Sequence, residues 1–198
     1  MHTESLLKLD ALQEEINKYR PFGSELVAQV EKYYRVCLVF TSNALEGFTY
    51  TESETKVLLE DGLTAGGRPL KDAFAVLGHA KAYDHMFSLL HAEGLIEKDV
   101  LLFHSMLEGS LENEAEGGKY RTVTSFISGS KYPLTPPAEI PEAMDGLFRF
   151  INGGMNAMHP VEFAAQAHKK LVFIHPFADG NGRVSRLVMN TLLIQRGY

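Results

Sequence analysis

Cysteine is almost absent from this chain of 198 residues, which has Cys37 as its one thiol and contains no tryptophan. A single cysteine excludes a disulfide within the chain and favours a reducing compartment. Cys37 lies in the apolar stretch 36–40, which predicts buried packing rather than reactivity. Long apolar runs are also missing, since none approaches the roughly 18 residues of a membrane-spanning helix, and residues 1–5 lack the pattern of a signal peptide. We therefore expect a soluble, cytoplasmic protein with no membrane partner.

An excess of positive charge is missing as well. Nineteen basic residues stand against 25 acidic ones, which gives a formal net charge of −6, and no lysine-rich block occurs. This balance argues against a nucleic-acid partner, although it leaves room for a local phosphate pocket. A hydrophobic content of 45% at this length is enough for one domain with a substantial core.

Helical periodicity is the main structural signal in the chain. Apolar residues spaced by three and four predict helices over residues 4–19, 24–45, 51–60, 70–92, 97–107, 139–152, 161–174 and 183–196. The stretch 120–128 is instead rich in β-branched and aromatic residues and precedes a Pro-rich segment, so it predicts a short β-hairpin lying on the helical body. The predicted fold class is therefore all-α, a helical bundle with a small β-hairpin flap.

Residues 175–186, which read HPFADGNGRVSR, hold the densest group of chemically capable side chains. Pro176 biases His175 away from helical geometry, so the imidazole should lie in a loop just after the helix 161–174. A histidine titrates near neutral pH, as a general base requires. Asp179 offers a hard carboxylate oxygen to Mg²⁺, which takes its other ligands from phosphate and water.

The second half of this stretch is suited to an anion. Gly180, Asn181 and Gly182 allow a sharp turn whose N–H groups point into a concavity, and a helix that begins there adds its dipole. Arg183 and Arg186 follow on one polar stripe and suit bidentate phosphate contacts. A plain helix connection with a surface ion pair would explain any one of these residues, but not all of them in this order.

Other histidines have simpler explanations. His159 precedes Pro160, a pairing typical of a helix start. His79, His85 and His91 are spaced by six residues rather than by the four of a metal-binding helix, so we expect them on a helix surface.

The stretch 175–186 resembles the Fic signature, HPFx(D/E)GNGRxxR, at every specified position. The resemblance implies an AMP transferase that moves AMP from ATP to a Ser, Thr or Tyr hydroxyl of a target protein. It makes His175 the base and Asp179 the Mg²⁺ ligand. The resemblance also makes Gly180, Asn181 and Gly182 the anion hole and gives Arg183 and Arg186 the β- and γ-phosphates. A glycine at Gly182 favours AMP over another phosphate group.

The resemblance extends to an inhibitory pattern, (S/T)xxxE(G/N), which Ser42, Glu46 and Gly47 match. Gly47 also reads as the residue that ends the helix 24–45. By resemblance, Glu46 pairs with Arg186 while Ser42 helps to fix the helix, so the γ-phosphate loses its arginine. The resemblance likewise makes the hairpin a flap that holds the target by strand pairing. Phe126 or Ile127 would clamp the target, with the register left open.

We expect an N-terminal helical region, 1–60, that includes the inhibitory helix, and a catalytic core, 61–198. Residues 159–165 and 189–193 resemble in particular the animal Fic enzyme of the endoplasmic reticulum, which also removes AMP with its inhibitory glutamate orienting water. Two alternatives therefore stay open, AMP removal assisted by Glu46 and a nucleotide-sensing module without turnover. Family members usually continue beyond the motif helix, so either the adenine pocket is more open here or the chain is a fragment that ends at Tyr198. The target protein and any oligomeric state are left open by the sequence.

Overall fold

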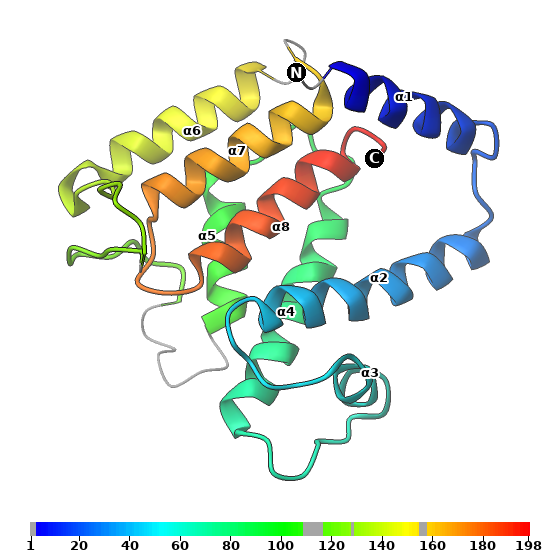
Figure 1. Ribbon diagram of the computed structural model, residues 1–198, viewed down its shortest axis with the longest axis horizontal. Coiled ribbons are helices and arrows are strands. Elements are labelled where there is room, and N and C mark those ends of the chain that lie inside the picture. Colours follow the sequence, from blue (N-terminus) through cyan, green and yellow to red (C-terminus); the bar gives the residue numbers. More distant parts are fainter. Residues whose placement is uncertain (1–2, 109–116, 128, 155–157) are drawn as a thin grey trace.

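The computed structural model describes residues 3–108, 117–127, 129–154 and 158–198 (Figure 1). Within these ranges the chain forms α-helices and one short 3-10 helix, and no strand. The elements are α1 (Thr3–Asn17), α2 (Ser24–Ala44), α3 (Glu52–Asp61), α4 (Leu70–Ser88), α5 (Glu97–Glu108), η2 (Pro137–Glu139), α6 (Ile140–Gly154), α7 (Pro160–Ile174) and α8 (Asn181–Ile194). The predicted all-α class is confirmed, and each predicted helix is present with ends that differ by a few residues.

Local sequence signals explain where several helices begin and end. At the start of α3, Thr51 and Glu54 form a reciprocal capping box, in which each side chain accepts a hydrogen bond from the other residue's N–H group. His159 caps α7, because its side chain accepts from the N–H of Val161, and Pro160 occupies the first helical position. Gly47, at a φ of 85°, ends the turn after α2 in the left-handed region that favours glycine.

α8 lies at the centre of the molecule and contacts α7, α4, α5 and α2. Figure 1 shows α6, α7 and α8 side by side, with α4 and α5 crossing behind them. The main core fills the space between these helices with fully buried side chains that include Phe103, Leu107, Met144, Phe163, Leu171, Phe177, Leu187 and Val188. A smaller cluster under α2, α3 and α4 contains Val39, Tyr50, Leu58, Ala73, Val76 and Ala80.

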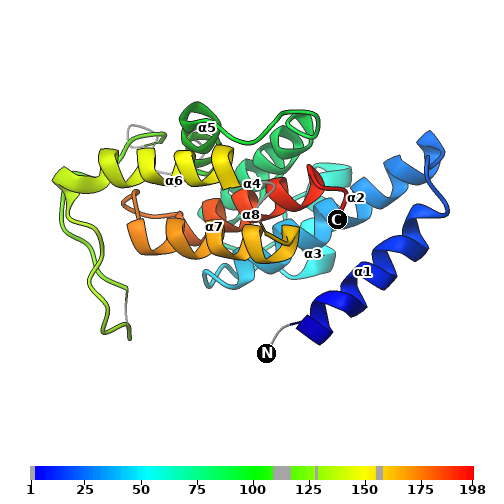
Figure 2. The ribbon, with the colours of Figure 1, turned by 90° about the horizontal axis from the view of Figure 1, so that it is seen from above.

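α1 reaches away from this body (Figure 2) and is held partly by polar contacts. The Asp10 carboxylate accepts a hydrogen bond from the hydroxyl of Tyr198 at 3.0 Å and lies 2.9 Å from Nε2 of His159. None of the described helices is long and apolar enough to span a bilayer.

The predicted β-hairpin is wrong as a paired structure, because residues 120–127 and 129–136 contain no strand. Figure 2 shows this segment leaving the helical body beside the start of α6 and returning to it. Phe126 is 84% exposed, so most of its apolar surface is left uncovered by the described part of the chain. An isolated two-stranded ribbon is marginally stable in water, and β-rich composition alone does not provide the partner that it needs. Ser128 and most of the predicted break at 112–119 lie outside the described residues.

Two smaller predictions also need correction. His79 is fully buried rather than on a helix surface, and its Nδ1 lies 3.2 Å from the side-chain oxygen of Asn43. A sequence spacing of six cannot reveal that α2 covers this side of α4. Cys37 is half-buried, not buried.

Candidate active site

His175 follows the last residue of α7 and has a left-handed backbone, with φ at 51° and ψ at 57°. This conformation costs a non-glycine residue roughly 1 kcal/mol or more, so the surrounding structure must hold it in place. Its N–H donates to the carbonyl of Leu171 at 2.9 Å. The ring Nδ1 lies 3.3 Å from the carbonyl oxygen of Val172, which can only accept, so Nδ1 carries the proton in this contact and Nε2 keeps its lone pair.

The pKa of His175 is lowered from its ordinary value, chiefly because the ring is partly buried. The positive charge of Arg121 lowers this pKa further, while the carbonyl of Val172 and the carboxylates of Asp179 and Glu46 raise it. The net effect favours the neutral imidazole, which is the form a general base requires.

Hydrogen bonds between its own residues hold the loop after His175. The side chain of Asn181 accepts from the N–H of Phe177 at 2.9 Å and donates to the carbonyl of the same residue at 2.8 Å. The ring of Phe177 is fully buried and stacks on His104, with the ring centroids 3.9 Å apart. Gly180 precedes α8 at a φ of 73°, a conformation that side chains rarely adopt. Asn181 therefore holds the turn, and Gly180 provides its geometry.

The side chain of Arg183 points from α8 into the protein interior and not toward the exposed surface of this turn. Its side chain is 1% exposed, and its Nη2 donates to Oε1 of Glu108 at 2.9 Å, a carboxylate that is itself 5% exposed. The guanidinium also lies under the ring of Phe48, 5.2 Å from the centroid. Burial raises the pKa of Glu108, while the nearby Arg183 lowers it. Sequence spacing placed both motif arginines toward the glycine turn, but Arg183 faces Glu108 in this structure.

Arg186 is bound by the inhibitory pattern. Its Nε donates to Oγ of Ser42 at 2.7 Å, and its Nη2 donates to the Ser42 carbonyl at 2.9 Å and to Oε1 of Glu46 at 2.6 Å. The Glu46–Arg186 pair expected from the resemblance is therefore present. A Cβ atom at Gly182 would overlap Oε1 of Glu46, so this carboxylate lies directly against the glycine of the anion turn.

Asp179 is exposed at the mouth of the turn, and its Oδ1 accepts from the N–H of Gly180 at 2.7 Å. No group of three or more His, Cys, Asp or Glu side chains that could hold a metal occurs among the described residues. One exposed carboxylate fits a Mg²⁺ ion that arrives with phosphate and water ligands, and does not fit a cage built by protein alone.

Several residues of this site were not found from the sequence. Glu108, His104 and Arg121 all contact the turn or its neighbours, yet they belong to no motif and show no special spacing. A glutamate at the end of an apolar helix was the one available signal for Glu108, and it reads equally as a solvated helix end.

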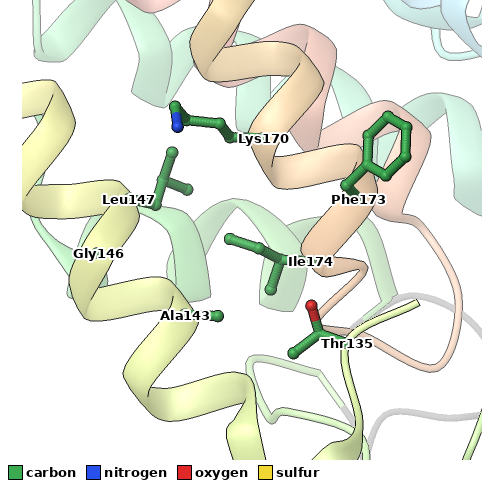
Figure 3. Close-up of a pocket in the computed structure, with 7 residues that line it drawn as sticks. All are labelled: Thr135, Ala143, Gly146, Leu147, Lys170, Phe173 and Ile174. Atoms are coloured by element: carbon green, nitrogen blue, oxygen red, sulfur yellow. The ribbon is translucent and has the colours of Figure 1, made fainter. Parts of the chain in front are cut away.

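A groove of about 360 Å³ lies between α6 and α7, close to His175 along the chain (Figure 3). It is lined by Thr135, Ala143, Gly146, Leu147, Lys170, Phe173 and Ile174. On the α6 side the lining includes the two small residues Ala143 and Gly146. Phe126 and Ile127 do not line it.

Known proteins share both this fold and this motif. A family model described as "Fic/DOC family" matches residues 94–193. The protein adenylyltransferase Fic of Drosophila melanogaster is 35% identical over 173 residues, which are 86% of this chain and 34% of that protein. The protein of the same name from Drosophila persimilis is 34% identical over 196 residues, which are 98% of this chain and 38% of that protein. The chain thus spans little more than a third of these relatives.

Solved structures agree with the sequence relatives. Fic-1 (residues 134–508) of C. elegans superposes with a TM-score of 0.87 at 27% identity, covering 98% of this chain and 57% of that one. A signalling protein with a Fic domain from Bacteroides thetaiotaomicron gives a TM-score of 0.85 at 27% identity, covering 98% of this chain and 74% of that one. With the family model matching half of its length around His175 and the anion turn, this chain belongs to the Fic/DOC family.

Proposed function

We propose that this protein transfers AMP from ATP to a Ser, Thr or Tyr hydroxyl of a target protein. The observation that carries the proposal is the placement of His175, a partly buried and predominantly neutral base, directly before an anion turn that opens α8. The relatives named protein adenylyltransferase support this reaction class. Within the chain, we assign residues 1–60 to regulation and residues 61–198 to catalysis.

In this reaction, Nε2 of His175 takes the proton of the target hydroxyl while the hydroxyl oxygen attacks the α-phosphorus of ATP. The bond between the α-phosphorus and the α–β bridging oxygen breaks, and pyrophosphate leaves. The Val172 carbonyl keeps the other ring nitrogen protonated, so the imidazole presents its lone pair to the hydroxyl. Positioning supplies most of the rate in such transfers, so the rigid loop between His175 and Gly180 matters as much as the base itself.

The phosphates would lie against the N–H groups at the start of α8, where the helix dipole favours negative charge. Arg186 would hold the γ-phosphate as a bidentate donor. Asp179 would hold Mg²⁺, which neutralises charge on the α- and β-phosphates when it is bound. Arg183 would support this site from below through Glu108, because in this structure its charge is already paired and buried.

We further propose that Glu46 inhibits the transfer. Its carboxylate occupies both Arg186 and the surface of Gly182, the two places where a terminal phosphate would be held. ATP could then bind only with its phosphates displaced, which would leave the α-phosphorus out of line with the hydroxyl.

A direct test is transfer of label from ATP carrying ³²P at the α-position, in the presence of Mg²⁺. The unaltered protein, Glu46→Gly, and Glu46→Gly combined with His175→Ala are compared, with self-modification as the readout and a cell lysate as a source of targets. We expect label chiefly with Glu46→Gly and its loss when His175 is absent. A silent Glu46→Gly that still binds ATP would contradict the transferase proposal.

A second candidate function is hydrolysis that removes AMP from a modified protein. The Glu46 carboxylate lies against Gly182 of the anion turn and is bonded to Arg186, so in this reaction it would orient a water molecule over the turn. Under this alternative Glu46→Gly loses activity on an AMP-modified protein, whereas inhibition predicts a gain of transfer. The third alternative is a nucleotide-sensing module, which would bind ATP but neither transfer AMP to a protein nor remove it.

A further inference from the structure

Arg121 is a buried arginine whose hydrogen-bond acceptors are all main-chain carbonyls. Its side chain is 4% exposed. Nε donates to the carbonyl of His175 at 2.8 Å, Nη1 to the carbonyl of Val123 at 2.8 Å, and Nη2 to the carbonyl of Thr135 at 2.5 Å. The N–H of Arg121 also donates to the carbonyl of Pro176 at 2.8 Å. Burial of a charge without a carboxylate partner costs stability, so this arrangement needs an explanation.

The three carbonyls belong to two separate parts of the chain, the segment 123–135 and the loop that begins at His175. Val123 and Thr135 are the two ends of the segment 123–135, which the structure describes over residues 123–127 and 129–135; the described part leaves the helical body and carries the exposed Phe126. The third carbonyl belongs to His175 itself. One planar guanidinium therefore fastens both ends of this segment to the backbone of the histidine, with a fork geometry that lysine cannot reproduce.

Neighbouring contacts fix the residues before this segment in the same way. The N–H of Gly118 donates to Nδ1 of His104 at 2.9 Å, and the hydroxyl of Tyr120 donates to the carboxylate of Glu97 at 2.6 Å. The approach to the segment is thus anchored to α5, while Arg121 anchors the segment itself to the turn that holds His175.

We propose that Arg121 is a positioning residue that sets the distance between the segment 123–135 and His175, so that a target protein held by this segment presents its hydroxyl to the base. This inference rests on the proposed transfer reaction. Arg121 touches neither ATP nor the target in it. Because Arg121 bonds to both the segment and the backbone of His175, it fixes the position of the target hydroxyl relative to the imidazole.

Two substitutions separate the hydrogen bonds of Arg121 from its charge. Arg121→Lys keeps the charge but cannot span three carbonyls, whereas Arg121→Met removes both the charge and the bonds. In the Glu46→Gly background we expect each substitution to lower the maximal rate of self-labelling about tenfold or more, because a displacement of about 1 Å can cost that much. The KM for ATP should stay within about twofold, since Arg121 bonds to the backbone of His175 and Pro176, which precede the anion turn at residues 180–182. Arg149→Met removes an exposed arginine of α6 and is the matched control.

The pH dependence of labelling provides a readout that a merely structural role would not move. The charges that act on His175 are those of Arg121, which lowers its pKa, and of Asp179 and Glu46, which raise it. Glu46 is absent from the test background. Loss of the Arg121 charge raises the pKa of His175, so Arg121→Met moves the rising limb of the rate toward higher pH. Arg121→Lys keeps the charge and leaves this limb where it is.

The two proposals fail in different ways. If Glu46→Gly does not label, or labels without His175, the transferase proposal is overturned before Arg121 is considered. If Glu46→Gly labels and Arg121→Lys labels equally well, the positioning role is overturned. A parallel loss of ATP affinity in Arg121→Lys would overturn it too, since the residue would then act on the nucleotide site. Circular dichroism establishes whether each variant folds. If Arg121→Met does not fold, Arg121→Lys alone still tests the positioning role.

Discussion

Replacement of Glu46 is the perturbation whose size can be worked out most directly from the contacts. Glu46 and Arg186 form one charge-assisted hydrogen bond of 2.6 Å, and their side chains are 33% and 20% exposed, respectively. A bond of this type contributes about 1.5 to 3 kcal/mol, and partial exposure places it toward the lower end. Under the proposed inhibition, a terminal phosphate would have to displace this carboxylate before it reached Arg186. We therefore expect Glu46→Gly to raise ATP affinity by about tenfold, the equivalent of about 1.4 kcal/mol.

The effect on transfer should exceed the effect on affinity. Removal of the carboxylate also clears the surface of Gly182, which Oε1 of Glu46 now covers, so the phosphates can reach an in-line position as well as bind. Glu46→Gln separates the two contributions, because it keeps the size of the side chain and removes its charge. The charged Arg186 can still donate to the neutral amide oxygen of Gln, but the attraction between opposite charges is lost. Glu46→Gln should therefore recover part of the gain in ATP affinity and little of the gain in transfer rate.

The assay measures ATP dissociation by isothermal titration and self-labelling by transfer from α-labelled ATP, for the unaltered protein, Glu46→Gln and Glu46→Gly. Glu93→Gly is the matched control, because Glu93 is exposed in the loop after α4. An affinity that does not change in Glu46→Gly would refute the competition argument. A Glu46→Gln variant that labels as fast as Glu46→Gly would refute the role given to the volume of the carboxylate over Gly182.

Three further predictions follow from contacts around the same turn. Ser42→Ala removes the acceptor of the Arg186 Nε bond but keeps the Ser42 carbonyl, so it should raise self-labelling by a few-fold, less than Glu46→Gly does, since one such bond contributes about 1 kcal/mol. Glu108→Gln leaves the buried charge of Arg183 without its partner and should lower the free energy of unfolding by about 3 kcal/mol in urea titrations, whereas an unchanged value would show that the pair is dispensable. Burial lowers the pKa of His79 from its ordinary value near 6.5 to about 3, so between these pH values the unfolded chain binds a proton that the folded chain does not. Stability should therefore fall as pH drops from about 6.5 toward 3, and His79→Gln should flatten that fall in unfolding curves at two pH values.

Local signals were sufficient for most of the fold. The capping box at Thr51, the proline after His159 and the glycine at Gly47 each specify a helix end through short-range geometry, and all three operate as the sequence predicts. The contact between Glu46 and Arg186 spans 140 residues of sequence, yet it was expected because both residues belong to motifs that the resemblance identifies.

Contacts that depend on packing between distant elements were not predictable in this way. His79 looks like a surface histidine by its spacing, but α2 covers it and Asn43 bonds to its ring. Arg121 lies in a stretch whose composition indicates strands, although its function in the structure is to bind three carbonyls from two segments. Propensity describes the preference of one segment, whereas these residues are determined by the segments that meet them.

The two motif arginines illustrate this limit and its consequence for the mechanism. A spacing of three residues in an α-helix separates two side chains by about 60° around the axis, so Arg183 and Arg186 are neighbours without facing the same partner. The fold uses that angle: Arg183 points down to Glu108 and is 1% exposed, while Arg186 points to α2 and is 20% exposed. The charge of Arg183 is cancelled by a buried carboxylate, so the motif arginine whose charge is accessible to a phosphate is Arg186. Glu46 is bonded to that arginine, so under the proposed inhibition a single carboxylate just after α2 would be enough to compete with ATP.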